Sequence, residues 1–260
     1  MTSLQRLIKY LAIALAISII VGLISVALQV FSFFSFSSKE SNRPLKLLNE
    51  YNSNEINSID ISLKSVKLEI NEGQNFEVKS NSKYISLKLE DGKLIIKEKS
   101  HLSIGKNYSL IVTIPENTIF DSFKLDTGSG NIKINSLYVN NLDFDLGAGN
   151  FLTNNLNVYK LAKIDGGAGK IEIKGGAINN LDFDIGVGEA IINSLLLGNN
   201  NIDCGVGRLE LNLIGDDYNI SIDSTGTSNI NGKNLKNYGI GDSIVKIDGG
   251  IGNIKIETNK

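Results

Sequence analysis

Apolar and polar residues alternate along most of the chain after residue 58. Ile59, Ile61 and Leu63 alternate with polar residues, and later segments repeat the pattern as Lys170-Ile-Glu-Ile173 and Asn253-Ile-Lys-Ile256. Successive side chains of a β-strand point to opposite faces, so this period of two is typical of strands with one buried face. The pattern therefore predicts an all-β fold.

A six-residue motif, apolar-Asp-x-Gly-x-Gly, recurs within this alternating region. Its copies begin at Leu125, Phe144, Ile164, Phe183, Ile202 and Ile247, and a degenerate copy, IDSTGT, begins at Ile222. In sequence order the starting positions step by 19, 20, 19, 19, 20 and 25 residues. A fixed period with strand-like content is typical of stacked solenoids, in which each copy forms one coil. We therefore predict a β-solenoid similar to a parallel β-helix, with about 20 residues per coil.

An uncharged, largely apolar run covers residues 10–36, after a short tail of residues 1–9. About 20 apolar residues span a bilayer as a helix, so the run is long enough to cross a membrane. It is longer than the apolar core of a cleavable signal peptide, and it ends in bulky residues, Phe31-Ser-Phe-Phe-Ser-Phe36. We therefore predict an N-terminal transmembrane helix that acts as an uncleaved signal anchor.

The orientation of this anchor follows from what flanks it. Basic residues stand on both sides, so the positive-inside rule does not decide. The short tail and the long, net-acidic, β-rich remainder favour a C-terminal part outside the cytoplasm of a bacterial cell. The alternative is an N-out protein with a cytoplasmic solenoid. After the anchor we expect a juxtamembrane linker at 37–58 with one short helical turn at Leu45–Tyr51, a strand-rich region at 59–122 and the repeat solenoid at 123–260.

Composition narrows the function classes. The formal net charge is −2, which lacks the basic footprint of a nucleic-acid-binding protein. Cys204 is the single cysteine, so no disulfide can form within the chain. An exported protein without disulfides fits a bacterial envelope better than a eukaryotic secretory route.

The repeated aspartates are the sharpest candidate site. They are Asp126, Asp145, Asp165, Asp184, Asp203, Asp223 and Asp248. Stacked carboxylates repel one another, which backbone donors, protonation or bound Ca²⁺ could offset. The order Asp-before-Gly and the long period match known calcium repeats poorly. We favour structural capping of turns by these side chains, with a cation ladder and an outward acidic stripe as the alternatives.

Other motifs give weaker signals. Gly-x-Gly lacks the third glycine and the helix of a dinucleotide site. His101 lies in a polar turn, and Cys204 fills a slot that Leu146 and Ile185 occupy in sister coils, which favours a buried small side chain. Arg208 is the lone arginine beyond Arg43. The sequence predicts no catalytic, cofactor-binding or metal-binding residues and no cofactor.

One segment resembles a known family. Ile111-Val-Thr-Ile-Pro115 ends a strand, and Phe123-Lys-Leu-Asp-Thr-Gly-Ser-Gly-Asn-Ile-Lys-Ile134 follows it. This combination resembles the bacterial putative-adhesin family of membrane-anchored β-strand-repeat proteins, over about residues 59–257. The resemblance implies an envelope β-solenoid of largely unknown function, sometimes linked to adhesion or envelope-stress signalling, and carries over no catalytic residues.

We therefore expect a non-enzymatic, membrane-anchored envelope protein with an adhesin-like or scaffold surface. Its expected partners are the membrane, through the N-terminal helix, and an envelope protein or cell-wall polymer, but not nucleic acid. An envelope-stress regulatory partner of another membrane protein is the alternative, and a β-helix carbohydrate-active enzyme is the third hypothesis. We also expect the last repeat, Asn253–Lys260, to be a bare solenoid edge protected by charge, in a monomer or weak homo-oligomer.

Overall fold

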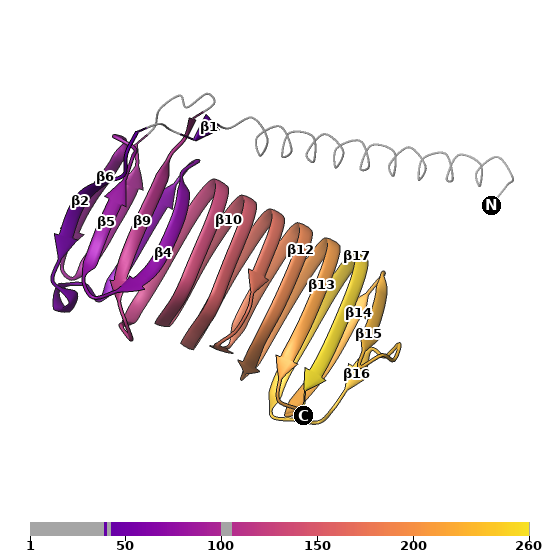
Figure 1. Ribbon diagram of the computed structural model, residues 1–260. Coiled ribbons are helices and arrows are strands. Elements are labelled where there is room, and N and C mark those ends of the chain that lie inside the picture. The colour runs from indigo at the N-terminus through magenta and orange to yellow at the C-terminus, as the bar shows by residue number, and fades with distance from the viewer. Residues whose placement is uncertain (1–38, 41–42, 100–105, 260) are drawn as a thin grey trace, which may run out of the picture. The chain divides into compact units, whose positions relative to one another are not determined.

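The computed structural model describes residues 39–40, 43–99 and 106–259 (Figure 1). These residues are β-strands and connecting turns, with a single turn of 3-10 helix, η1 (Ser53–Glu55). Within the described part of the chain, no helix has the length and apolar character needed to cross a membrane. The predicted tail at 1–9 and the predicted anchor at 10–36 lie outside the described residues.

The strands form one 15-stranded sheet that winds into a solenoid, and β1 (Lys39–Glu40) pairs with β8 (Lys106–Asn107) separately. The first part of the solenoid contains β2 (Lys46–Tyr51), β3 (Ser58–Leu63), β4 (Lys67–Gly73), β5 (Phe76–Ser80), β6 (Ile85–Glu90), β7 (Lys93–Glu98) and β9 (Ser109–Pro115). The rest contains β10 (Ile119–Ile173), β11 (Ala177–Asn179), β12 (Leu181–Leu197), β13 (Asn199–Ile214), β14 (Tyr218–Ser224), β15 (Thr227–Ile230), β16 (Asn237–Tyr238) and β17 (Ser243–Asn259). The predicted all-β solenoid is thus confirmed over the described residues.

Neighbouring coils pair in parallel with the repeat motif in register. Asp165 pairs with Asp184, and Asp184 pairs with Asp203, so equivalent positions stack from coil to coil. A parallel ladder fixes this register because a shift of one residue would turn every apolar side chain outward. We call each set of stacked equivalent positions a column.

The columns that point inward form the core. The apolar residue before each Asp is buried in every copy of the motif, and Phe123 packs edge-on against Phe144 with ring centroids 5.8 Å apart. Side-chain sizes compensate inside the coil: where Gly166 follows Asp165, Ile171 fills the space, since its Cδ1 lies 2.6 Å from the position of an added Cβ. In the next coil the equivalent residues, Ile185 and Ala190, reverse the large and small positions.

The Gly-x-Gly segment makes a corner at which adjacent coils approach closely. Gly188 has φ +147°, and a Cβ at this residue would lie 1.9 Å from the backbone oxygen of Gly169. No L side chain fits at that distance, so the motif requires glycine for steric reasons as well as for backbone conformation. The middle residue of the motif points to solvent, as the 68% exposure of Ile251 shows.

The C-terminal end differs from the expectation. β17 lies between β13 and β14, pairing with β13 from Asn199↔Ile244 to Ile214↔Asn259 and with β14 and β15 on its other side (Figure 1). The prediction that Asn253–Lys260 forms a bare edge was therefore wrong. The chain skips one coil after β13, builds the outer coil from β14 and β15, and then returns to fill the gap. β16 covers part of the outer coil by antiparallel pairing at Ile220↔Tyr238.

The N-terminal end doubles back in a similar way. β3 pairs with β10 on one side and with β7 on the other, while β4 lies between β10 and β9. Antiparallel strands continue beyond this outer coil, and β2 is the last strand in the order β9-β5-β2. β2 occupies the stretch for which a helical turn at Leu45–Tyr51 was predicted, so that prediction was wrong.

Candidate functional site

The seven repeated aspartates stand just before the glycine corner of each coil and point outward. Because each one follows a buried residue, the strand period places it on the outer face. Asp203 pairs with Asp248, and Asp248 pairs with Asp223, so the spatial order of the column departs from the sequence order at its end. At the other end of the column, Asp126 pairs with Ser62.

These side chains form an acidic stripe. Six of the seven are exposed and Asp165 is half-buried. Within the described residues, none of their carboxylates accepts a hydrogen bond from the backbone, and Asp165 pairs with Lys163 at 2.8 Å. The favoured prediction, turn capping by the aspartates, was therefore wrong, and the structure corresponds to the outward stripe. The described residues contain no group of three or more His, Cys, Asp and Glu side chains that could hold a metal ion.

Repulsion along the stripe perturbs one carboxyl group. Partial burial raises the pKa of Asp203, and the neighbouring carboxylates of Asp248 and Asp184 raise it further. Like charges in direct register disfavour the ionised form, and partial desolvation strengthens the effect. The stripe thus disfavours the ionised form at Asp203, through burial and through its neighbours in the column.

A second outward column lies two residues before the aspartates. Lys124 pairs in register with Asp60, and its amine lies 2.8 Å from the carboxylate of Asp143. Lys163 likewise pairs in register with Asp182. The hydrogen bond and the charge of Asp143 raise the pKa of Lys124. Signs therefore alternate in this column from Asp60 to Asp182, and the uncharged Asn201 ends the alternation.

The residues that follow the glycine corner in successive coils form a ladder of ion pairs. Arg208 lies 3.1 Å from Glu189 and also pairs with Glu210, while Lys170 lies 3.4 Å from Glu189. Lys255 lies 3.6 Å from Glu210. Partial burial acts to raise the pKa of Glu210, but Arg208 and Lys255 outweigh it and hold the pKa below its ordinary value. Arg208, which the sequence singled out only as a lone arginine, belongs to a network that connects neighbouring coils through these contacts.

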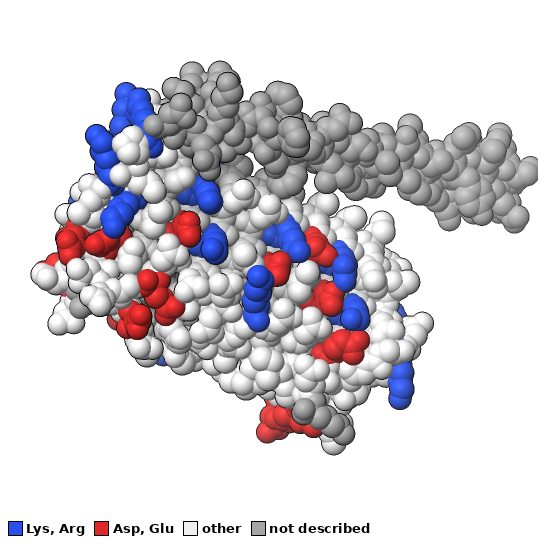
Figure 2. Space-filling model, in the orientation of Figure 1, with Lys and Arg blue, Asp and Glu red and all other residues white. Residues whose placement is uncertain are grey.

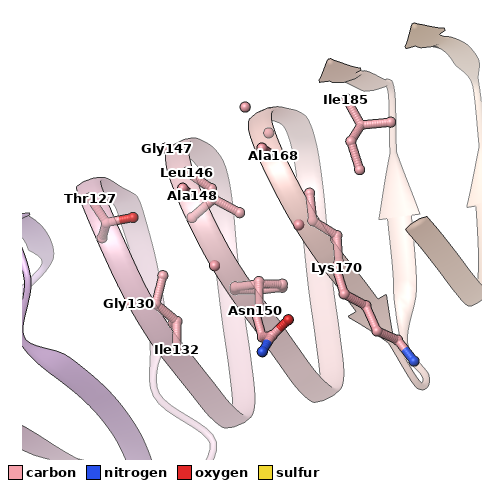
Figure 3. Close-up of a pocket in the computed structure, with 16 residues that line it drawn as sticks. Thr127, Gly130, Ile132, Leu146, Gly147, Ala148, Asn150, Ala168, Lys170 and Ile185 are labelled. Carbon is pink, nitrogen blue, oxygen red and sulfur yellow. The ribbon is translucent and has the colours of Figure 1, made fainter. Parts of the chain in front are cut away.

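A shallow depression with room for about one water molecule lies at the glycine corner (Figure 3). Gly147, Gly149 and Gly169 line it together with the buried side chains of Leu146 and Ile171. Asn150 and Lys170 project from the strand that follows the glycines. The corner thus lies between the acidic stripe and the charged residues that follow the glycines.

Cys204 and His101 are the two remaining candidates from the sequence. Cys204 is buried, with 7% exposure, between Ile185 and Gly249 in adjacent coils, and burial raises the pKa of its thiol. This agrees with the predicted small buried side chain. His101 lies outside the described residues.

Sequence reasoning missed the column that contains Lys124 and Lys163, although these residues stand two positions before an aspartate and that spacing was a usable signal.

These observations define a class of protein, a parallel β-solenoid with charged outward columns. Residues 56–240 match the family described as Toastrack DUF4097, which covers more than half of the chain. The chain therefore belongs to the Toastrack DUF4097 family. No match was found among curated proteins.

Several solved bacterial structures are similar to the chain. A putative cell adhesion protein from Clostridium sporogenes is 17% identical over 83% of this chain and 99% of that chain, with a TM-score of 0.36. A putative adhesin from Bacteroides fragilis is 14% identical over 84% and 100%, with a TM-score of 0.35. A putative lipid binding protein from Parabacteroides distasonis is 15% identical over 86% and 100%, with a TM-score of 0.36.

Proposed function

We propose that this chain is a non-enzymatic, membrane-anchored protein of the bacterial envelope, whose solenoid offers an adhesin-like or scaffold surface. The observation that carries the proposal is the register of the outward columns. Equivalent positions stack at every coil, so like charges meet in the pair Asp184↔Asp203 and opposite charges meet in the pair Glu189↔Arg208. A surface of this kind presents charged side chains at a fixed spacing along its length.

The physical argument concerns periodicity and rigidity. Coils are spaced by about 4.8 Å, so seven copies of the motif extend over roughly 30 Å. Solenoids bind partners along such extended surfaces, and the preformed backbone reduces the ordering cost of binding. An extended chain with its own regular repeat, such as a polymer strand or a β-strand of another protein, can meet equivalent side chains at successive coils.

The membrane part of the proposal rests on the sequence. The uncharged residues 10–36 are long enough to span a bilayer, and the described solenoid follows within a few residues. Placed outside the cytoplasmic membrane, the solenoid would be held at the cell surface or in the space next to it. Its expected partners there are envelope proteins and cell-wall polymers.

The experiment uses the full chain expressed in a bacterial host. Carbonate-resistant membrane association, with digestion of the solenoid by protease added to intact spheroplasts, is expected for an anchored extracytoplasmic protein. Full-length protein in lipid vesicles should then sediment with isolated cell-wall sacculi or with intact cells. A variant with Glu189→Lys and Glu210→Lys, which reverses charge in the ion-pair ladder, should bind differently from a Ser221→Ala control outside the ladder.

Each result bears on one part of the proposal. Release by carbonate would contradict the anchor. Resistance of the solenoid to external protease would indicate the N-out orientation. A chain that stays in the membrane, binds neither sacculi nor cells, but cross-links to one membrane protein would favour the regulatory alternative over adhesion.

A further inference from the structure

The end of the solenoid that carries β2 combines exposed leucines with exposed cations. Three large apolar side chains are exposed there: Leu45 by 46%, Leu47 by 51% and Leu48 by 38%. We call these three side chains the leucine edge. Three exposed leucines within four residues at a sheet edge are a candidate contact surface.

Basic residues surround the same end. Lys46 pairs in register with Ser80, which places the start of β2 beside the loop that carries Lys83. The backbone amide of Lys99 donates to the carbonyl of Tyr84 at 2.8 Å, so Lys99 lies at this loop as well. Together with Arg43, these exposed residues form what we call the basic end. Figure 2 shows blue side chains at the upper edge of the first strands and red side chains below them.

The first part of the solenoid also carries a more positive net charge than the repeats. Residues 43–99 hold 10 Lys and Arg against nine Asp and Glu. Residues 107–259 hold 11 Lys and Arg against 18 Asp and Glu. An anionic surface would therefore attract the part that carries β2 and repel the repeats.

The position of the leucine edge in the chain identifies its partner. Only nine residues, 37–45, separate the uncharged run of residues 10–36 from β2. A chain of that length reaches at most about 30 Å even when fully extended. If the run spans a bilayer, β2 is tethered close to the headgroups. Apolar side chains next to cations are the composition with which proteins bind anionic lipid surfaces.

We propose that the leucine edge and the basic end form a docking surface for anionic lipid headgroups, which holds β2 against the membrane. The inference rests on the proposed anchor and adds a second contact to it. Contact occurs at headgroup level, where water still reaches the outer backbone groups of β2, because unpaired backbone groups are not tolerated in the hydrocarbon core. A β-bulge between Leu47 and Asn49 interrupts the outer edge, which disfavours pairing with a second copy.

The absence of tryptophan from the sequence provides the test. Leu47→Trp introduces a single indole reporter into the full chain, which is reconstituted in vesicles of zwitterionic and anionic phospholipid with brominated acyl chains. The matched control is Ile251→Trp, which places the same reporter at an exposed repeat corner. The indole of the Leu47→Trp variant should emit at shorter wavelength and be quenched at least about threefold more than that of the control. Adding Lys46→Glu and Lys83→Glu should remove most of that difference without changing the thermal melt.

The outcomes separate the two proposals. Failure of the chain to float with vesicles would overturn the anchor, and the lipid contact with it. Flotation of a Leu47→Trp variant that is no more quenched than the Ile251→Trp variant would overturn the lipid contact alone. A blue-shifted but unquenched Leu47→Trp variant, together with a dimer in cross-linking, would replace the lipid by a second copy of the chain.

Discussion

Each end of the solenoid has an inner and an outer coil, and the order of the two coils along the chain is opposite at the two ends. At the N-terminal end the inner coil, β3 and β4, comes first in the chain, and the outer coil of β7 and β9 is added to it. At the C-terminal end the outer coil of β14 and β15 comes first, and β17 enters beneath it later. The outer coil at the N-terminal end therefore pairs with strands that precede it in the chain. The outer coil at the C-terminal end pairs with β17, which follows it in the chain. This coil should fail when that strand is removed.

Removal of β17 should have the largest effect. Truncation after Asp242 deletes four buried apolar side chains, Val245, Ile247, Ile254 and Ile256. At about 1.5–3 kcal/mol each, their burial amounts to about 6–12 kcal/mol, which is comparable to the whole stability of a typical domain. We expect the truncated chain to lose cooperative unfolding in a thermal melt. Deletion of residues 1–48 at the other end removes exposed residues of β2 and should cost less than about 1 kcal/mol; equal losses would contradict the asymmetry.

A glycine in the segment that returns to β17 should come next. Gly239 has φ +75°, and a Cβ there would lie 2.0 Å from the backbone oxygen of Tyr218. Gly232 has the same φ but nothing within 4 Å. Gly239→Ala should lower the free energy of unfolding by about 3 kcal/mol or more, and Gly232→Ala by about 1 kcal/mol. Denaturant titration of both variants separates steric contact from backbone conformation, and similar losses would refute the close crossing.

The tyrosine at the start of the outer coil should have a smaller effect. The hydroxyl of Tyr218 donates to the carbonyl of Ile214 at 2.7 Å and is buried with the ring. Tyr218→Phe should cost about 1 kcal/mol, because the carbonyl loses its donor. The N-terminal counterpart, Tyr51→Phe, should change stability by less than about 0.5 kcal/mol, since Tyr51 is half-buried and contacts Phe76 through its ring. Urea denaturation measures both, and a larger loss from Tyr51→Phe would reverse the comparison.

The smallest expected effect is a gain in stability. Because the pKa of Asp203 is raised in the folded state, the folded chain binds this proton more tightly than the unfolded chain, and stability falls as the pH rises from 3.8. Asp203→Asn removes the repulsion and should raise Tm at pH 7 by about 1–2 °C.

Two controls accompany that substitution. The gain should vanish near pH ~3, where the wild-type carboxyl group is already protonated. Asp223→Asn, which lies at the end of the column with one register neighbour, Asp248, should give a smaller gain. An equal or larger gain from Asp223→Asn would show that repulsion along the column does not control stability.

Much of the fold could be predicted because apolar and polar residues alternate in each repeat, which distinguishes inward from outward positions. The stacking of Phe144, Ile164 and Phe183 follows from period-two alternation and the fixed spacing. The order of the last two coils could not be predicted, because every copy offers the same inward columns and therefore fits beside any other. The only signal was the longer step of 25 residues between Ile222 and Ile247.

The candidate site was partly accessible from the sequence. The aspartates were identified correctly as a column, but the capping prediction ignored that a residue after an inward side chain must point outward. β2 was missed because its residues from Lys46 to Glu50 are all exposed, so they show no alternation. A strand without a buried face resembles a linker in sequence. Its exposed leucines were the feature that could have indicated a contact surface.

The insertion of β17 has a consequence for biosynthesis. A growing polypeptide emerges from its N-terminus, so β14 and β15 leave the ribosome before the strand that joins them to β13. Most coils of this solenoid can be added by templating on the coil just made, but this pair has no finished template until residues 243–259 have been translated. During that interval the edge of β13 is open to other strands. A chain that has completed β13 but lacks residues 243–259 is thus the form of this protein most open to pairing with other strands.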